Sequence, residues 1–228
     1  MAPPDQDVPA DGETQGSGAV DFPPVETVRT LLIAGHLLGL AFGVGGALTL
    51  DIIAFRYFYL DRITHEKLLL FRFIARLVAA GLLILWLTGL GFLWLYWQFE
   101  PELLGNPKIW AKVVIVMVLT INGWLLHHKL FPILDRNLGK PLFYRISVDE
   151  KAIMFSLSSI SIISWGFPLV LGIARSLNFT TGMEDILAFY FLMLSATCLF
   201  MLLVFKLFLE PLRRFFIERP VRRRAFRP

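Results

Sequence analysis

The sequence predicts an all-α membrane protein, a polytopic bundle of five transmembrane helices with its N-terminus outside and its C-terminus in the cytoplasm. Of its 228 residues, 56% are hydrophobic and 14% are aromatic, a balance far more apolar than that of a soluble domain. Five apolar runs reach the length of about 20 residues that a helix needs to cross a bilayer, and none alternates as barrel strands do. The runs are 30–50, 77–99, 109–131, 152–174 and 186–205.

The distribution of lysine and arginine gives the orientation. Residues 51–76, residues 129–151 and the tail from 206 together hold 18 of the 22 basic residues. With five spans these three segments share one side of the membrane, and basic loops favour the cytoplasmic side. The lipid bilayer is therefore the expected partner of the basic residues, and no nucleic acid is needed to explain them.

The chain divides into three parts by composition. Residues 1–28 are acidic and rich in proline and glycine, without apolar periodicity, which predicts a disordered tail. Residues 29–209 form the five-helix transmembrane domain. Residues 210–228 form a basic cytoplasmic tail that can contact anionic head groups.

The first span contains one ionisable side chain, His36. Steps of three or four residues lead from it to Gly39, Gly43 and Gly46, so His36 begins a face with almost no side chains. Such a face accommodates either a neighbouring helix, through the small-xxx-small spacing of Gly35, Gly39 and Gly43, or a porphyrin lying on the three glycines with His36 on its iron. This helix alone favours packing, yet an intramembrane histidine is by default a functional-site hypothesis.

The short outer loop EPELLGNPK makes spans two and three antiparallel neighbours. In span three, Lys112, Gly123 and His127 fall on one stripe of the helix. At about 1.5 Å per residue, Lys112 lies within about 6 Å of the depth of His36, whereas His127 lies about 16 Å from it. Lys112 can thus approach the same pocket, and His127 cannot share its iron. The alternative is that Lys112, His127 and His128 extend to the membrane interfaces.

Two blocks of sequence resemble a known group of proteins. HLLGLAFGVGGALTLDIIAF, which starts at His36 and is followed by basic residues, resembles the first helix of the HemJ, CopD and related families of bacterial integral membrane proteins, with Gly46 as the glycine about ten residues after the histidine. Trp110 and Lys112, continued by VVIVMVLTINGWLLHHK, are similar to the third helix of HemJ. FYRISVDE, residues 143–150, resembles the segment before the last helix of that family.

The resemblance implies a helical core that binds b-type haem, with His36 as axial ligand of the iron and Lys112 in the site. HemJ proteins act in protoporphyrinogen oxidation, and CopD-type members handle copper. We therefore expect a haem-binding protein of the bacterial cytoplasmic (inner) membrane, either a HemJ-like oxidoreductase or an electron-transfer subunit, with a porphyrin substrate or a redox partner. The chain could also form a homo-oligomer. The alternative is a transporter or a structural or assembly subunit without haem, including CopD-like copper handling.

An axial histidine needs an acceptor for its other ring nitrogen, which fixes the tautomer. Hydroxyl groups on span four are the candidates, although serines in membrane helices usually bond to their own helix. Pro168 in the same span should free a carbonyl group near the level of His36. The sequence contains no HExxH, CxxC or Met-x-x-Met pattern for zinc or copper. The candidate serines are Ser156, Ser158, Ser159, Ser161 and Ser164.

Overall fold

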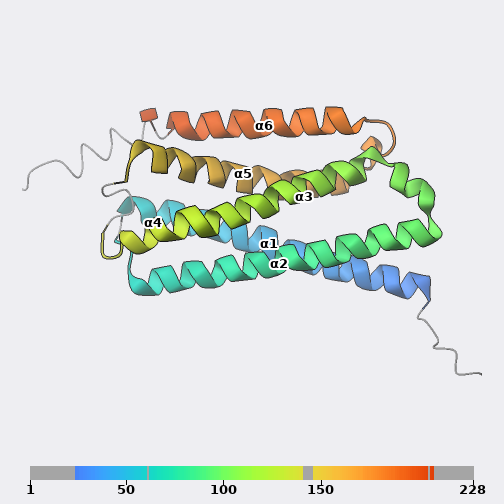
Figure 1. Ribbon diagram of the computed structural model, residues 1–228, viewed down its shortest axis with the longest axis horizontal. Coiled ribbons are helices and arrows are strands. Elements are labelled where there is room, and N and C mark those ends of the chain that lie inside the picture. Colours follow the sequence, from blue (N-terminus) through green and yellow to red (C-terminus); the bar gives the residue numbers. More distant parts are fainter. Residues whose placement is uncertain (1–23, 61, 141–145, 205, 208–228) are drawn as a thin grey trace, which may run out of the picture.

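The computed structural model describes residues 24–60, 62–140, 146–204 and 206–207, and these residues fold into helices joined by short connections (Figure 1). The long helices are α1 (Val25–Leu60), α2 (His65–Phe99), α3 (Pro107–Leu125), α5 (Val148–Ile173) and α6 (Met183–Val204). The short pieces are the 3₁₀ turn η1 (Pro101–Gly105), the π-helical turn η2 (Leu126–Leu130), α4 (Phe131–Arg136) and the 3₁₀ turn η3 (Arg175–Leu177).

Within the described residues, five helical stretches are long and apolar enough to cross a membrane. This confirms the predicted all-α bundle of five spans, and the chain is an integral membrane protein. The third span joins α3, η2 and α4 into one helical rod with a π-turn inside it. The stretches are Val25–Ala54, His65–Phe99, Pro107–Arg136, Val148–Ile173 and Met183–Val204.

The first helix is longer at both ends than the sequence predicts. It begins at Val25, within the predicted tail, where the carbonyl group of Pro24 accepts hydrogen bonds from the N–H groups of Thr27 and Val28. At the other end it continues to Leu60, because no glycine or proline interrupts the chain after the apolar run. The rest of the predicted acidic tail, residues 1–23, and the predicted basic tail 210–228 lie outside the described residues.

The helices form two groups. α1 packs along α2, while α3 packs against α5 and α6, and α5 joins the groups by contacting α1 (Figure 1). Helices α2 and α3 are antiparallel, as expected, but α3 is packed mainly on α5 and α6 instead of on α2. The indole N–H of Trp86 on α2 does reach α3, where it donates a 3.0 Å hydrogen bond to the hydroxyl of Thr120. Cavities lie on either side of this bridge.

The crossing of α1 and α2 depends on glycine. A Cβ atom on Gly81 would lie 2.7 Å from the backbone nitrogen of Gly43 and 2.8 Å from the carbonyl oxygen of Gly39. On Gly46 it would lie 2.6 Å from a methyl group of Val78. The two backbones therefore touch directly, the close approach that small residues permit between membrane helices.

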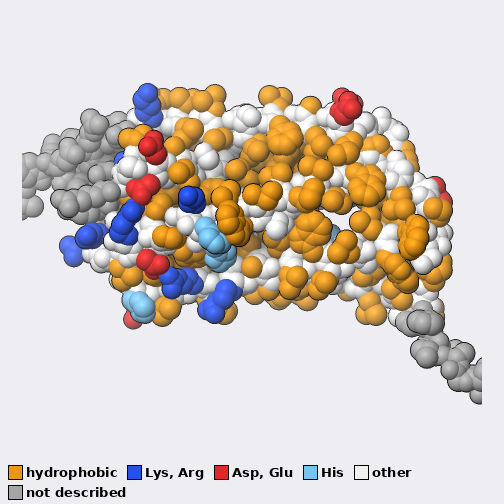
Figure 2. Space-filling view, in the orientation of Figure 1, with side chains coloured by type: hydrophobic (Ala, Val, Ile, Leu, Met, Phe, Trp, Pro, Cys, Tyr) orange, Lys and Arg blue, Asp and Glu red, His pale blue; other side chains and the backbone are white. Residues whose placement is uncertain are grey.

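Charged side chains gather at one end of the bundle, where α1 ends and α2 begins, while the middle of the visible face is apolar (Figure 2). At that end Arg72 on α2 donates to both carboxylate oxygens of Asp135, at 2.8 and 2.7 Å. The backbone of Ile63 also exchanges hydrogen bonds with Gly139 and Lys140. This grouping is the one on which the predicted orientation depends, and the orientation itself stays a prediction.

Candidate functional site

A cavity of about 460 Å³ lies between α1, α2, α3 and α5, in the half of the bundle that holds the start of α1 and the end of α2. We call it the outer cavity. His36 lines it from α1 and Lys112 lines it from α3, so the structure brings together the two side chains that the sequence paired by depth. The remaining wall comes from α2 and α5 and is mostly apolar.

The ring of His36 is held in place by Thr88 on α2. Its Nδ1 lies 2.8 Å from the Thr88 hydroxyl oxygen. When that hydroxyl donates its one hydrogen to the carbonyl oxygen of Ile84, at 2.7 Å, it acts as the acceptor for His36. The Nδ1 atom therefore carries the proton. The Nε2 atom keeps its lone pair, and no group in the described residues hydrogen-bonds to it.

Aromatic side chains support the imidazole from α2. The ring of Phe92 meets His36 edge-on, with centroids 5.8 Å apart, and Tyr96 stacks on Phe92 at 6.2 Å. All three rings line the outer cavity. Their spacing of four residues puts Phe92 and Tyr96 on one face of α2, together with Thr88.

Lys112 is the cationic group of the cavity. In the described part of the chain no carboxylate pairs with it. The neighbouring Lys108, in contrast, is buried and donates to the carbonyl oxygen of Ala174 and to the side chain of Asn178, at 2.7 and 2.9 Å. Lys108 thus joins the beginning of α3 to the end of α5, whereas Lys112 lines the cavity.

The predicted cofactor face of α1 takes a different role. Gly39, Gly43 and Gly46 do not line the outer cavity. Gly39 and Gly46 are covered by α2, and Gly43 is covered by the indole ring of Trp165, which a Cβ atom would approach to 2.2 Å. For these three residues the structure supports the helix-packing alternative.

Different glycines open the cavity. Gly89 on α2 and Gly172 on α5 both line it, and a Cβ atom on either would have no neighbour within 4 Å. The spacing of glycines on α1 cannot reveal them, because each lies on another helix. Their sequence signal is only an isolated glycine inside an apolar span, which usually indicates packing.

Three of the serines predicted to accept from His36 make other bonds, and Ser158 and Ser161 line a different cavity. Ser164 bonds to the hydroxyl of Tyr190 at 2.8 Å, Ser159 to its own helix at Phe155, and Ser156 contacts Cys198 on α6. The acceptor is Thr88 instead. In the structure Thr88 precedes the end of α2 by as many residues as His36 follows the start of α1, which puts both at one depth. The predicted runs 30–50 and 77–99 do not show this, because α1 begins before residue 30.

His127 lines a second cavity, of about 380 Å³, and not the outer one. We call this the inner cavity. The position of His127 agrees with the residue count along the spans, which predicts that His127 and His36 lie at different depths. His128 faces elsewhere and bonds to the carbonyl oxygen of Trp124 at 2.8 Å. Pro168, inside α5, does lie in the wall of the outer cavity, as its depth predicts.

Groups of three or more histidine, cysteine, aspartate or glutamate side chains that could hold a metal ion do not occur among the described residues. In comparisons with protein-family models, curated proteins and solved structures, none matches this chain.

Proposed function

We propose that this membrane protein binds b-type haem in the outer cavity, with His36 as the axial ligand of the iron. The observation that carries the proposal is the imidazole itself. Its Nδ1–H is held by Thr88 at 2.8 Å, and its Nε2 stays free on a ring that lines a cavity. A neutral histidine oriented through its second nitrogen is the form that ligates a metal.

The outer cavity suits a large apolar ligand. Its volume of about 460 Å³ lies within the range of about 300 to 1,000 Å³ that ligand pockets occupy. Leu37, Leu40, Leu85 and Trp165 supply an apolar wall. A haem group held there would supply one-electron chemistry, while the protein sets its ligand, its surroundings and its access to water.

Lys112 supports an anionic ligand. It lines the cavity from α3, without a carboxylate partner in the described residues. A charged lysine in apolar surroundings is costly unless it is paired. The carboxylates of a porphyrin are suitable partners, and we assign Lys112 to one of them.

The reaction is the finer part of the proposal. We infer a HemJ-like oxidoreductase of the bacterial cytoplasmic membrane, acting in protoporphyrinogen oxidation, or an electron-transfer subunit. The resemblance of the His36 and Lys112 segments supports this assignment. Porphyrin analysis of cells that lack the protein tests it, since a block at this step causes porphyrinogen-derived material to accumulate, whereas an electron-transfer role leaves porphyrin levels normal.

Colour tests haem binding directly. Protein purified from haem-replete cells should show a Soret band and a pyridine haemochrome of the b type. His36→Ala should abolish both, while His128→Ala should retain them, because His128 lies on neither cavity. Lys112→Met should weaken haem retention and Lys112→Arg should preserve most of it.

A colourless preparation would favour the alternative, a transporter or an assembly subunit without haem. One observation supports that alternative. Trp86, Leu119 and Trp165 line both cavities, so the outer and inner cavities follow one another through the bundle with a thin partition between them. Uptake of candidate solutes by proteoliposomes would then be the measurement to make.

A further inference from the structure

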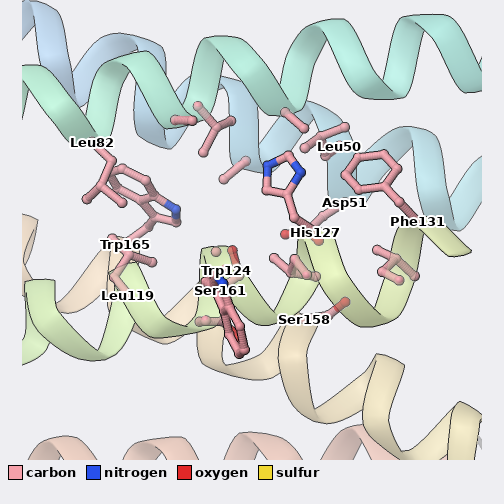
Figure 3. Close-up of a pocket in the computed structure, with 18 of the residues that line it drawn as sticks. Leu50, Asp51, Leu82, Leu119, Trp124, His127, Phe131, Ser158, Ser161 and Trp165 are labelled. Carbon is pink, nitrogen blue, oxygen red and sulfur yellow. The ribbon is translucent and has the colours of Figure 1, made fainter.

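The inner cavity contains polar groups that the proposed haem site does not use. It lies between the α1–α2 pair and the α3–α5 pair, and the ring of His127 projects into it with Asp51 beside it (Figure 3). Asp51 lies near the end of the membrane-spanning stretch Val25–Ala54, and within the described residues no group donates a hydrogen bond to its carboxylate. Such a group inside a membrane marks a functional site.

Asn122 adds a second unsatisfied group to the same wall. Its side chain is only 2% exposed, and neither its amide nitrogen nor its amide oxygen has a partner among the described residues. Burying an amide without hydrogen bonds is costly. The amide torsion of asparagine is soft, so a small rotation turns either atom to the cavity that Asn122 lines.

The polar groups stand at two depths. Asn122 precedes His127 by five residues, which is about 7.5 Å along a helix, and Ser158 precedes Ser161 by three residues, which is about 4.5 Å. Because α3 and α5 run in opposite directions, His127 and Ser158 share the deeper level toward the charged end. Asn122 and Ser161 share the level nearer the middle. This separation is comparable with that between two oxygen atoms on opposite sides of a six-membered ring.

From this arrangement we propose that the inner cavity binds a lipid-soluble para-quinone or its quinol. One ring oxygen meets His127 and Asp51, and the other meets Asn122 and Ser161. A quinone oxygen accepts from the amide N–H group, and a quinol hydroxyl donates to the amide oxygen or the carboxylate. A protonated lipophilic amine could donate to Asp51, but it has no lone pair with which to accept from the amide N–H group of Asn122.

The rest of the cavity fits the ring and its apolar tail. Phe131 and Trp165 supply flat walls (Figure 3), and aromatic pairs favour stacked or edge contacts. The cavity also reaches the lipid-facing surface, because Leu83 and Trp124 line it while 60% and 59% exposed. A ligand can therefore enter from the bilayer and leave its tail there.

Binding of a radiolabelled decyl-substituted benzoquinone to the full chain in nanodiscs tests the proposal, with empty nanodiscs subtracted. Saturable binding is expected. Asn122→Leu and Asp51→Leu should each weaken it by about tenfold, the cost of losing a buried hydrogen bond or two. Asn122→Leu should also raise the melting temperature of the ligand-free protein, which a purely structural asparagine would not do.

The serines of α5 provide a matched control. The double variant Ser158→Ala with Ser161→Ala removes two hydroxyls from the cavity wall, whereas Ser156→Ala with Ser159→Ala removes two from the same helix outside it. Only the first pair should weaken quinone binding. The proposal is overturned if binding is not saturable, if both pairs behave alike, or if a decyl amine competes through Asp51 while Asn122→Leu has no effect.

The quinone site does not depend on the proposed haem. His36→Ala should remove the Soret band and leave quinone affinity unchanged, since His36 does not line the inner cavity. Asn122→Leu should leave the Soret band unchanged and weaken quinone binding. Failure of one proposal is therefore distinguishable from failure of the other.

Discussion

The indole ring of Trp165 lies directly against the backbone of Gly43, so that a Cβ atom on Gly43 would come within 2.2 Å of the ring. This contact joins α5 to α1 at the level where the two cavities meet, because Trp165 lines both. It also explains why the glycine-rich face of α1 does not line the outer cavity. The glycines admit an indole ring and a neighbouring helix.

Gly43→Ala should therefore destabilise the protein. The added methyl group must displace a rigid ring that is itself buried, and overpacking of this kind costs about 1 to 3 kcal/mol. Unfolding in mixed micelles measures the loss. Gly45→Ala is the matched control, since a Cβ atom on Gly45 has no neighbour within 4 Å. Equal stability of the two variants would contradict the packing described here.

Thr88→Val should impair the haem site without unfolding the bundle. Valine keeps the shape of threonine but leaves the Nδ1–H of His36 without its acceptor. Loss of such a supporting hydrogen bond typically weakens a metal site by about 10-fold to 100-fold. Haem content per protein is the measurement. Thr88→Ser, which restores the hydroxyl, should recover it, and equal haem content in both variants would remove Thr88 from the site.

Gly89→Leu should fill the outer cavity. Nothing lies within 4 Å of a Cβ atom there, so the added side chain can enter the cavity instead of clashing with the core. We expect loss of haem with stability retained or improved, because leucine favours the helix more than glycine does. Gly45→Leu, on the outside of α1, should leave haem content unchanged. Normal haem content in Gly89→Leu would place the ligand elsewhere.

The hydrogen bond between Ser164 and Tyr190 should hold α5 to α6. Both side chains are fully buried, with their oxygen atoms 2.8 Å apart. Ser164→Ala and Tyr190→Phe should each cost about 1 kcal/mol, and the double variant should cost less than the sum of the two. A double-mutant cycle of unfolding free energies measures this coupling. Additive costs would show that the bond contributes nothing to the association of the two helices.

The five spans could be predicted from the sequence, because apolar length depends on neighbours along the chain. The orientation inferred from the positions of basic residues stays a prediction. The meeting of His36 and Lys112 followed from depth, which a residue count supplies. A residue count gives neither the rotation of each helix about its own axis nor which helices lie side by side. It could not show that Trp165 would occupy the glycine face of α1, nor that α3 would pack on α5 and α6 and leave space beside α2.

Thr88 illustrates the same limit on a single bond. Thr88 lies at the depth of His36, but span four contains more hydroxyl groups. Which of them reaches His36 depends on the side on which α2 packs against α1, and a sequence does not give that side. The sequence does not single out Asp51 or Asn122, because Asp51 follows the first apolar run and Asn122 lies off the stripe of Lys112 and His127. Their significance depends on a cavity wall assembled from several helices.

The paired backbone hydrogen bonds of Ile63 with Gly139 and Lys140, together with Arg72 and Asp135, clamp the charged ends of the first three spans to one another. A structure clamped at one end pivots there. Any opening of the bundle that admits a large ligand should consequently be widest at the opposite end. A ligand should therefore enter the outer cavity more readily than the inner one.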